Sequence, residues 1–109
     1  MKESSLEIYE SRLEKALEYI DENLGHKILL EDLAKEAFFS PFHFHRIFSS
    51  LQKEPLNEYV NRIKLEKASQ QLTFTNKSIK EISYSLGYSS NSVFYRAFKN
   101  HFECTPSFY

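Results

Sequence analysis

Residues 44–48 read FHRIF and residues 94–98 read FYRAF, so the chain carries nearly the same five-residue pattern twice, fifty residues apart. In each copy, two phenylalanines four residues apart flank an arginine, Arg46 or Arg96. Residues four apart lie on one face of a helix, so the phenylalanines indicate a buried side and the arginine an exposed side. The repeat therefore predicts two helices of one design in two similar structural units.

The residues before each copy enlarge the repeated unit. Periodic apolar residues predict a short helix at about 30–37 before the first copy and another over 79–87 before the second. A short helix, a tight turn and a longer helix with a polar outer side is the pattern of a helix-turn-helix, whose second helix fits the major groove of DNA. The pattern fits one such unit at about 30–53 and another at about 78–102, and it fits a plain α-helical bundle equally well.

Capping residues place the starts of the two longer helices. Ser40 is a good N-cap and Pro41 suits the first helical position, which predicts the start of the helix that carries FHRIF. Ser89 or Ser90 caps the helix that carries FYRAF. Ser78, with Glu81 three residues later, forms a capping box at the start of the shorter helix before it. Phe39 and Tyr88 lie 49 residues apart but Phe44 and Phe94 lie 50 apart, so the second turn is expected to be one residue longer than the first.

The N-terminal part predicts one long amphipathic helix. Ser4, with Glu7 three residues later, forms a capping box at its start. Apolar residues then recur at steps of three and four and predict a single buried stripe. The stripe consists of Leu6, Tyr9, Leu13, Leu17, Ile20 and Leu24.

Residues 56–72 predict a helix whose apolar side changes halfway. One face carries Leu56, Tyr59, Val60 and Ile63, whereas Leu65, Ala68 and Leu72 lie nearly opposite. A helix that packs on a single core keeps one stripe, so we expect this helix to pack on one small core at its start and another at its end. TPSFY at 105–109 predicts a last helical turn. The sequence thus predicts an all-α fold of about seven helices, in which two helix-turn-helix subdomains are joined by a long central helix.

Composition sets the class of protein. The 109 residues are enough for one domain, 41% of them are apolar, and two Gly and three Pro favour helices over hairpins. The only cysteine, Cys104, cannot form an internal disulfide, and no stretch resembles a signal peptide or a membrane span. We therefore expect a cytoplasmic protein with no membrane contact.

The charge distribution is uneven although the net charge is only −1. Residues 1–26 hold three Lys or Arg against seven Asp or Glu, whereas residues 40–99 hold nine against four. This asymmetry permits binding to nucleic acid but also fits a solvated mixed surface. His43 and His45 point about 200° apart on a helix and cannot share a metal, so we expect no metal site. The sequence has no Gly-rich phosphate loop, nucleophile–base pair or paired carboxylates, so we also expect no cofactor and no catalytic residue.

Four stretches together carry a family resemblance. LAKEAFFSPFHFHRIF at 33–48, the segment 56–72, IKEISYSLGYSSNSVFYRAFKNHF at 79–102 and the closing TPSFY resemble the AraC/XylS-type transcription regulators of bacteria. The resemblance covers about residues 13–109. It implies a sequence-specific DNA-binding domain over 1–109 that regulates transcription, with its two recognition helices in successive major grooves of double-stranded DNA. Grooves recur every ~34 Å, and a linker helix of some 17 residues is about 25 Å long.

The resemblance also implies which residues contact DNA. The base-facing places fall at Phe42, His45, Arg46, Asn91, Ser92, Tyr95 and Arg96. The candidate phosphate contacts are Ser40, Ser89 and Lys99. We further expect RNA polymerase as a partner, a monomer as an isolated domain, no small-molecule site in this segment, and a place as the N-terminal part of a longer regulator. The alternative is an α-helical protein-interaction domain that uses its acidic first helix and exposed aromatic residues; an enzyme is not expected.

Two positions depart from the family pattern. Phe38 stands in the first turn where the family usually has Gly, and Gly87 keeps that place in the second turn. If the turn needs a positive φ, Phe costs roughly 1–2 kcal/mol there. Leu29 stands where a Ser or Thr cap is usual, which weakens the start of the following helix by about 1 kcal/mol.

Overall fold

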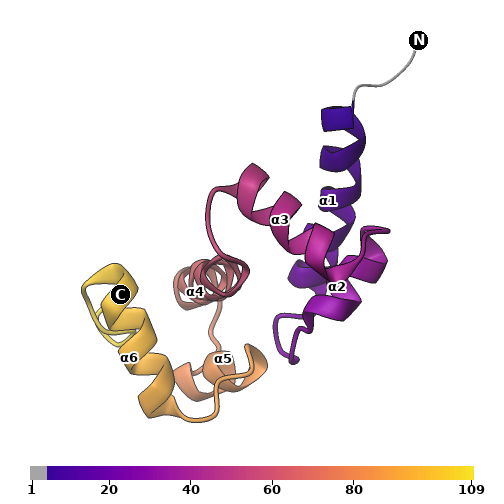
Figure 1. Cartoon of the computed structure of the whole chain (residues 1–109). Coiled ribbons are helices and arrows are strands. Elements are labelled where there is room, and N and C mark those ends of the chain that lie inside the picture. The colour runs from indigo at the N-terminus through magenta and orange to yellow at the C-terminus, as the bar shows by residue number, and fades with distance from the viewer. Residues whose placement is uncertain (1–4) are drawn as a thin grey trace. The chain divides into compact units, whose positions relative to one another are not determined.

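The computed structural model describes residues 5–109, with side chains from Leu6 on, and all regular secondary structure in this range is helical. The all-α prediction is therefore confirmed. The helices are α1 (Ser5–Glu22), α2 (Leu30–Glu36), α3 (Pro41–Gln52), α4 (Leu56–Phe74), α5 (Ile79–Ser85) and α6 (Asn91–Phe102) (Figure 1).

The chain folds into two compact units. The first unit contains the described residues up to Asn23 together with Ile28–Tyr59, and the second contains Leu24–Lys27 and Val60–Tyr109. In the first unit α1, α2 and α3 pack on one another, and in the second α5 packs on α6. Each unit holds one helix-turn-helix, α2–α3 in the first and α5–α6 in the second.

Each unit has its own apolar core. Two fully buried phenylalanines four residues apart anchor the longer helix of each pair, Phe44 and Phe48 on α3 and Phe94 and Phe98 on α6. The other large buried side chains are Leu13, Ile20 and Leu33 in the first unit and Leu24, Leu65, Ile82 and Leu86 in the second. The buried side of the repeated pattern is thus the one that the sequence predicts.

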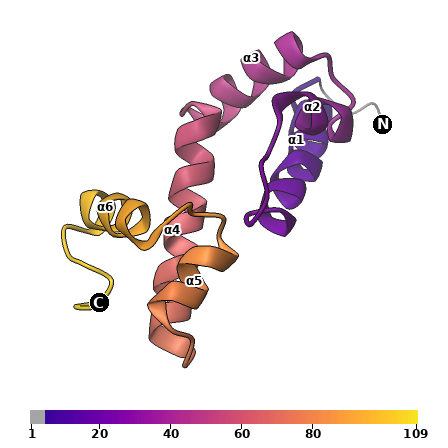
Figure 2. The same cartoon turned by 90° about the horizontal axis from the view of Figure 1, so that it is seen from below.

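α4 is one continuous helix (Figure 2), and the division between the two units falls within it, after Tyr59. Its first turn belongs to the first unit, where the Tyr59 ring meets the Phe48 ring edge-on at a centroid distance of 5.3 Å. Its later turns belong to the second unit, where Leu65 and Ala68 are buried. Of the first apolar face, Leu56 and Tyr59 belong to the first unit and Val60 and Ile63 to the second, so the change of apolar side does not coincide with the division. The helix also runs two residues further than expected, to Phe74.

The two turns share one backbone design. The first is closed by the amide of Phe39, which donates to the carbonyl of Ala34, and the second by the amide of Tyr88, which donates to the carbonyl of Ser83. Phe38 has φ +59° and Gly87 has φ +82°, so both turns require the left-handed backbone that glycine favours. The expected strain at Phe38 is therefore present.

The two glycines of the chain meet at the second turn. A Cβ on Gly25 would lie 2.5 Å from the carbonyl oxygen of Ser85, and a Cβ on Gly87 would lie 3.0 Å from the carbonyl oxygen of Gly25. Contacts that short exclude any side chain at Gly25. The short segment Leu24–Lys27 therefore rests directly on the second helix-turn-helix, within the second unit.

The predicted caps form with one refinement. The hydroxyls of Ser40, Ser78 and Ser90 accept hydrogen bonds from the third helical residue that follows, so Ser90 and not Ser89 caps α6. Leu29 makes no side-chain cap at the start of α2, as expected. Ser4, the predicted cap of the first helix, lies outside the described residues.

Two expectations about the ends of the chain are wrong. Leu6 is 53% exposed, and the buried stripe of α1 begins only at Leu13. Within this stripe Ala16 is fully buried, whereas Leu17 is half-buried. The expected seventh helix at 105–109 is a turn over 106–108, in which the amides of Phe108 and Tyr109 donate to the carbonyl of Thr105. The described residues therefore form six helices, close to the expected number of about seven.

Candidate nucleic-acid interface

The outer side of α3 carries the three residues expected to face bases from the first unit. Phe42, His45 and Arg46 are all exposed, and Phe42 is 74% exposed, which is unusual for a large apolar side chain. The guanidinium carbon of Arg46 lies 5.9 Å from the centroid of the Phe42 ring. No ion pair of the described residues involves Arg46, so its donors are available to a ligand.

His43, on the same helix, is occupied differently. Its ring packs edge-on against Phe39 and Tyr9, at centroid distances of 5.1 Å and 5.8 Å. The guanidinium carbon of Arg12 lies 5.1 Å from the Phe39 ring. His43 thus helps to fix α3 to α1, while His45 stays in solvent.

α6 presents its predicted residues less uniformly. Asn91, Ser92 and Arg96 are exposed. Tyr95 is half-buried, its ring lies edge-on to Phe94, and its hydroxyl oxygen lies 2.8 Å from that of Ser107. Tyr95 therefore already has a partner in the C-terminal turn.

The candidate phosphate contacts lie at both ends of the recognition helices. The hydroxyl of Ser40 accepts from the amide of His43 at 3.2 Å, which leaves its hydroxyl proton to donate outward. Ser89 is exposed beside the cap of α6, and Lys99 is exposed in its last turn.

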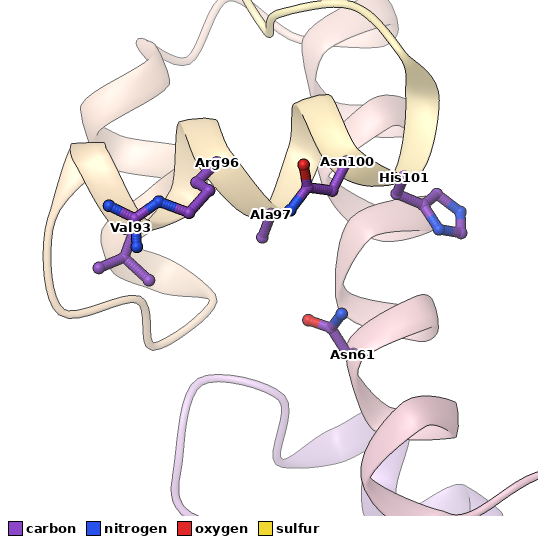
Figure 3. A pocket seen from close by; sticks show the side chains of 6 residues that line it. All are labelled: Asn61, Val93, Arg96, Ala97, Asn100 and His101. Atoms are coloured by element: carbon purple, nitrogen blue, oxygen red, sulfur yellow. The ribbon is translucent and has the colours of Figure 1, made fainter.

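An open groove in the second unit adds residues that sequence reasoning missed. It has a volume of about 430 Å³ and is lined by Asn61, Val93, Arg96, Ala97, Asn100 and His101. Figure 3 shows Asn61 projecting from α4 toward the space beside α6. Only Arg96 was predicted. Asn100 had a sequence signal, because it follows Arg96 by four residues on the same helical face. Asn61 had none, because it comes from another helix.

A second hollow, of about 280 Å³, brings Ser89 and Asn91 together with Lys80 and Tyr84 beside the second turn. Tyr88 also lines it, and burial raises the pKa of Tyr88 to about 12. Its buried hydroxyl has no hydrogen-bond partner among the described residues. The ammonium of Lys64 lies 5.6 Å from the Tyr88 ring, and desolvation by burial lowers the pKa of Lys64.

Other kinds of site find no support in the described residues. Within 5–109, no group of three or more His, Cys, Asp or Glu side chains could hold a metal ion. Each helix in the same range is too short or too polar to cross a membrane.

Comparisons with known proteins agree with this geometry. Residues 33–109 match the family described as "Helix-turn-helix domain". The regulatory protein PocR of Salmonella typhimurium is 35% identical over 101 residues, which cover 93% of this chain but only 33% of PocR. The regulatory protein SoxS of the same species is 31% identical over 97 residues, covering 89% of this chain and 91% of SoxS.

A solved structure has the same fold over most of its length. The transcriptional regulator from Chromobacterium violaceum, described as an AraC-type DNA-binding domain-containing protein, superposes with a TM-score of 0.82 at 28% identity, covering 90% of this chain and 88% of the other. The match to the family spans more than half of the chain, and both helix-turn-helix units are present. The chain therefore belongs to the helix-turn-helix domain family and is a DNA-binding domain of the AraC type.

Proposed function

We propose that this domain carries out sequence-specific binding of double-stranded DNA for transcription regulation by placing α3 and α6 in two successive major grooves. One observation carries the proposal. In each unit a capped helix of 12 residues is fixed by two buried phenylalanines and presents an exposed arginine from its other side. A rigid helix with an unpaired guanidinium on its outer side is what major-groove reading requires.

Arginine and asparagine supply the most specific contacts. Arg46 and Arg96 each have the paired donors that match O6 and N7 of guanine, and Asn91 can pair with adenine. The exposed Phe42 ring suits a thymine methyl. The full set of proposed base contacts is Phe42, His45, Arg46, Asn91, Ser92, Tyr95 and Arg96.

Phosphate contacts fix the register of the domain on DNA without reading sequence. We assign this role to Ser40 and Ser89, which lie at the N-terminal ends of α3 and α6, and to Lys99. The partial positive charge at a helix N-terminus favours a phosphate there.

The proposal also covers the domain in its cellular setting. Residues 30–53 and 78–102 are assigned as the two DNA-binding units and 56–72 as their linker. The domain acts in a cytoplasmic regulator that contacts RNA polymerase, is a monomer in isolation and has no enzymatic activity. This chain spans 33% of PocR but 91% of SoxS, so its relatives include both longer proteins and proteins of nearly its own length.

Selection of bound sites from random duplex DNA tests the function. We expect an enriched, asymmetric sequence, because two unlike recognition helices in one monomer impose no two-fold symmetry. Recovery of no preferred sequence would contradict the proposal. The competing function, a protein-interaction domain, is separated by salt: binding to duplex DNA falls steeply as salt rises.

A further inference from the structure

The groove between Asn61 and the outer side of α6 is lined mainly by hydrogen-bond donors. Four of its six lining side chains, Asn61, Arg96, Asn100 and His101, can donate hydrogen bonds, and none is a carboxylate. The chain as a whole holds 15 Asp and Glu. A surface lined by donors and free of acids suits an acceptor-only ligand.

The surrounding charges point the same way. α6 has two cations, Arg96 and Lys99, and no acidic residue between Asn91 and Phe102. On α4, Glu66 is engaged by Arg62, with the guanidinium nitrogen 3.1 Å from a carboxylate oxygen. The side chains that line the groove carry one fixed positive charge, on Arg96, and no negative charge.

Helix geometry aligns the groove with the proposed reading face. Arg96 and Asn100 lie four residues apart on the side of α6 opposite the buried Phe94 and Phe98. A ligand that touches Arg96 thus extends along the helix to Asn100. In Figure 3, Asn61 of α4 lies across the open space from Ala97 and Asn100 of α6. Val93 and Ala97 supply apolar contact between the polar groups.

We propose that this groove holds the sugar-phosphate backbone of one DNA strand, with the Asn61 and Asn100 amides and the His101 imidazole donating to phosphate oxygens. The proposal rests on the proposed function, since it takes duplex DNA as the occupant. Phosphate oxygens only accept hydrogen bonds, which matches the donor set. The Val93 and Ala97 side chains face the deoxyribose. Arg96 remains free to reach a base edge.

Charge-changing variants of nearly unchanged size test the groove. Asn61→Asp and Asn100→Asp each replace a donor by an anion, and Asn76→Asp is the matched control, because Asn76 is exposed in the same unit and does not line the groove. We expect Asn61→Asp and Asn100→Asp each to weaken binding by about tenfold or more. The loss should be equal for the best selected site and for random duplex. The control should lose no more than about twofold, because its charge is screened. Melting temperatures close to the parent's establish that the variants are folded.

A neutral replacement for a phosphate identifies which phosphate Asn61 contacts. Single phosphates of the selected site are replaced by methylphosphonate, one at a time. At one position, we expect the replacement to lower the affinity of the parent but to leave the affinity of Asn61→Ala unchanged. Inorganic phosphate is the second probe, and it should shift the Asn61 and Asn100 side-chain amide signals far less than duplex does.

Three results would overturn the groove assignment alone, with the parent still selecting a DNA sequence. These are variants that bind like Asn76→Asp, losses confined to the best site, and amide shifts as large with inorganic phosphate as with duplex. A parent that binds no duplex overturns the proposed function and the groove assignment together.

Discussion

At the scale of single residues, Phe38 and Gly87 adopt the same left-handed backbone with very different side chains. The Phe38 ring is 67% exposed, and the Lys15 ammonium lies 5.0 Å from its centroid. The family pattern has glycine at this place. A phenylalanine here keeps the strain, while its ring gains the contact with Lys15 of α1.

Substitutions at Phe38 separate the strain from the contact. Phe38→Ala removes the cation–ring contact and keeps a Cβ, whereas Phe38→Gly removes both. We expect Phe38→Gly to be more stable than Phe38→Ala by about 1 kcal/mol, because glycine adopts φ +59° without steric cost. Denaturant unfolding measures the difference. Equal stabilities would show that the turn is not strained.

Tyr88 links local burial to pH. The unfolded chain loses the phenol proton near pH 10, whereas the folded protein keeps it up to about pH 12. Unfolding therefore releases a proton in this window, and the free energy of unfolding should fall as pH rises from about 10 to about 12. Lys64 has the opposite sense, because its lowered pKa makes stability rise with pH below its usual value of 10.5.

Tyr88→Phe isolates the tyrosine, since Lys64 is present in both proteins. The variant should lack the extra loss of stability above pH 10. At pH 7 it should be at least as stable as the parent, because it removes a buried hydroxyl without a partner. A variant that is less stable than the parent at pH 7 would mean that this hydroxyl is hydrogen-bonded in solution.

Among the proposed base contacts, Arg46 is the one whose removal should reduce specificity most. Arg46→Ala should weaken the selected site by roughly 1–3 kcal/mol and relax specificity at one base pair. Binding to random duplex and the melting temperature should change little, because Arg46 is exposed and no described ion pair involves it. Arg96→Ala should weaken the selected site less than Arg46→Ala does. Unchanged affinity of Arg46→Ala for the selected site would remove Arg46 from the base contacts.

At the scale of helices, the outer face of α3 works only while its inner face is fixed. Phe48 is 1% exposed and packs against Phe44 at 5.8 Å and Tyr59 at 5.3 Å between ring centroids. Phe48→Ala should cost about 3–5 kcal/mol of folding free energy through the cavity it leaves. Calorimetry measures the loss, and Phe42→Ala, on the exposed side, is the control that should leave stability nearly unchanged.

The helices themselves could be predicted because their signals are local. Ser40, Ser78 and Ser90 each accept a hydrogen bond from the amide of the third residue after them and so cap their helices. The phenylalanine pairs mark the inner faces of α3 and α6. Tyr95 shows the limit of such reasoning. Its partner Ser107 lies 12 residues further on, in a C-terminal segment expected to be helical but folded as a turn.

The groove shows the same limit at greater distance. Asn61 and Asn100 line one surface only because the fold of the second unit brings residues of α4 and α6 to the same groove. No periodicity within either helix announces this. Asn100 could have been included from its spacing to Arg96, but Asn61 required the fold.

At the scale of the whole molecule, two reading helices in one chain demand a fixed distance between their sites on DNA. Inserting about half a helical turn, ~5 base pairs, between the two contacted segments moves one groove to the far face of the duplex. We expect the insertion to abolish specific binding. An insertion of about 10 base pairs returns the second groove to the same face of the duplex but lengthens the distance between the two sites. Comparing the two insertions separates the effect of the face from the effect of the distance. Affinity unchanged by the half-turn insertion would mean that only one unit reads DNA.

The most direct test of sequence-specific DNA binding is the ratio of affinities for the best selected site and for random duplex, measured at two salt concentrations. Both affinities should fall as salt rises, because lysine and arginine displace counterions from DNA. The ratio should stay at about 10³ or above at physiological salt, as for specific DNA-binding proteins in general. A ratio near one would contradict the account, because the domain would then hold DNA by charge alone.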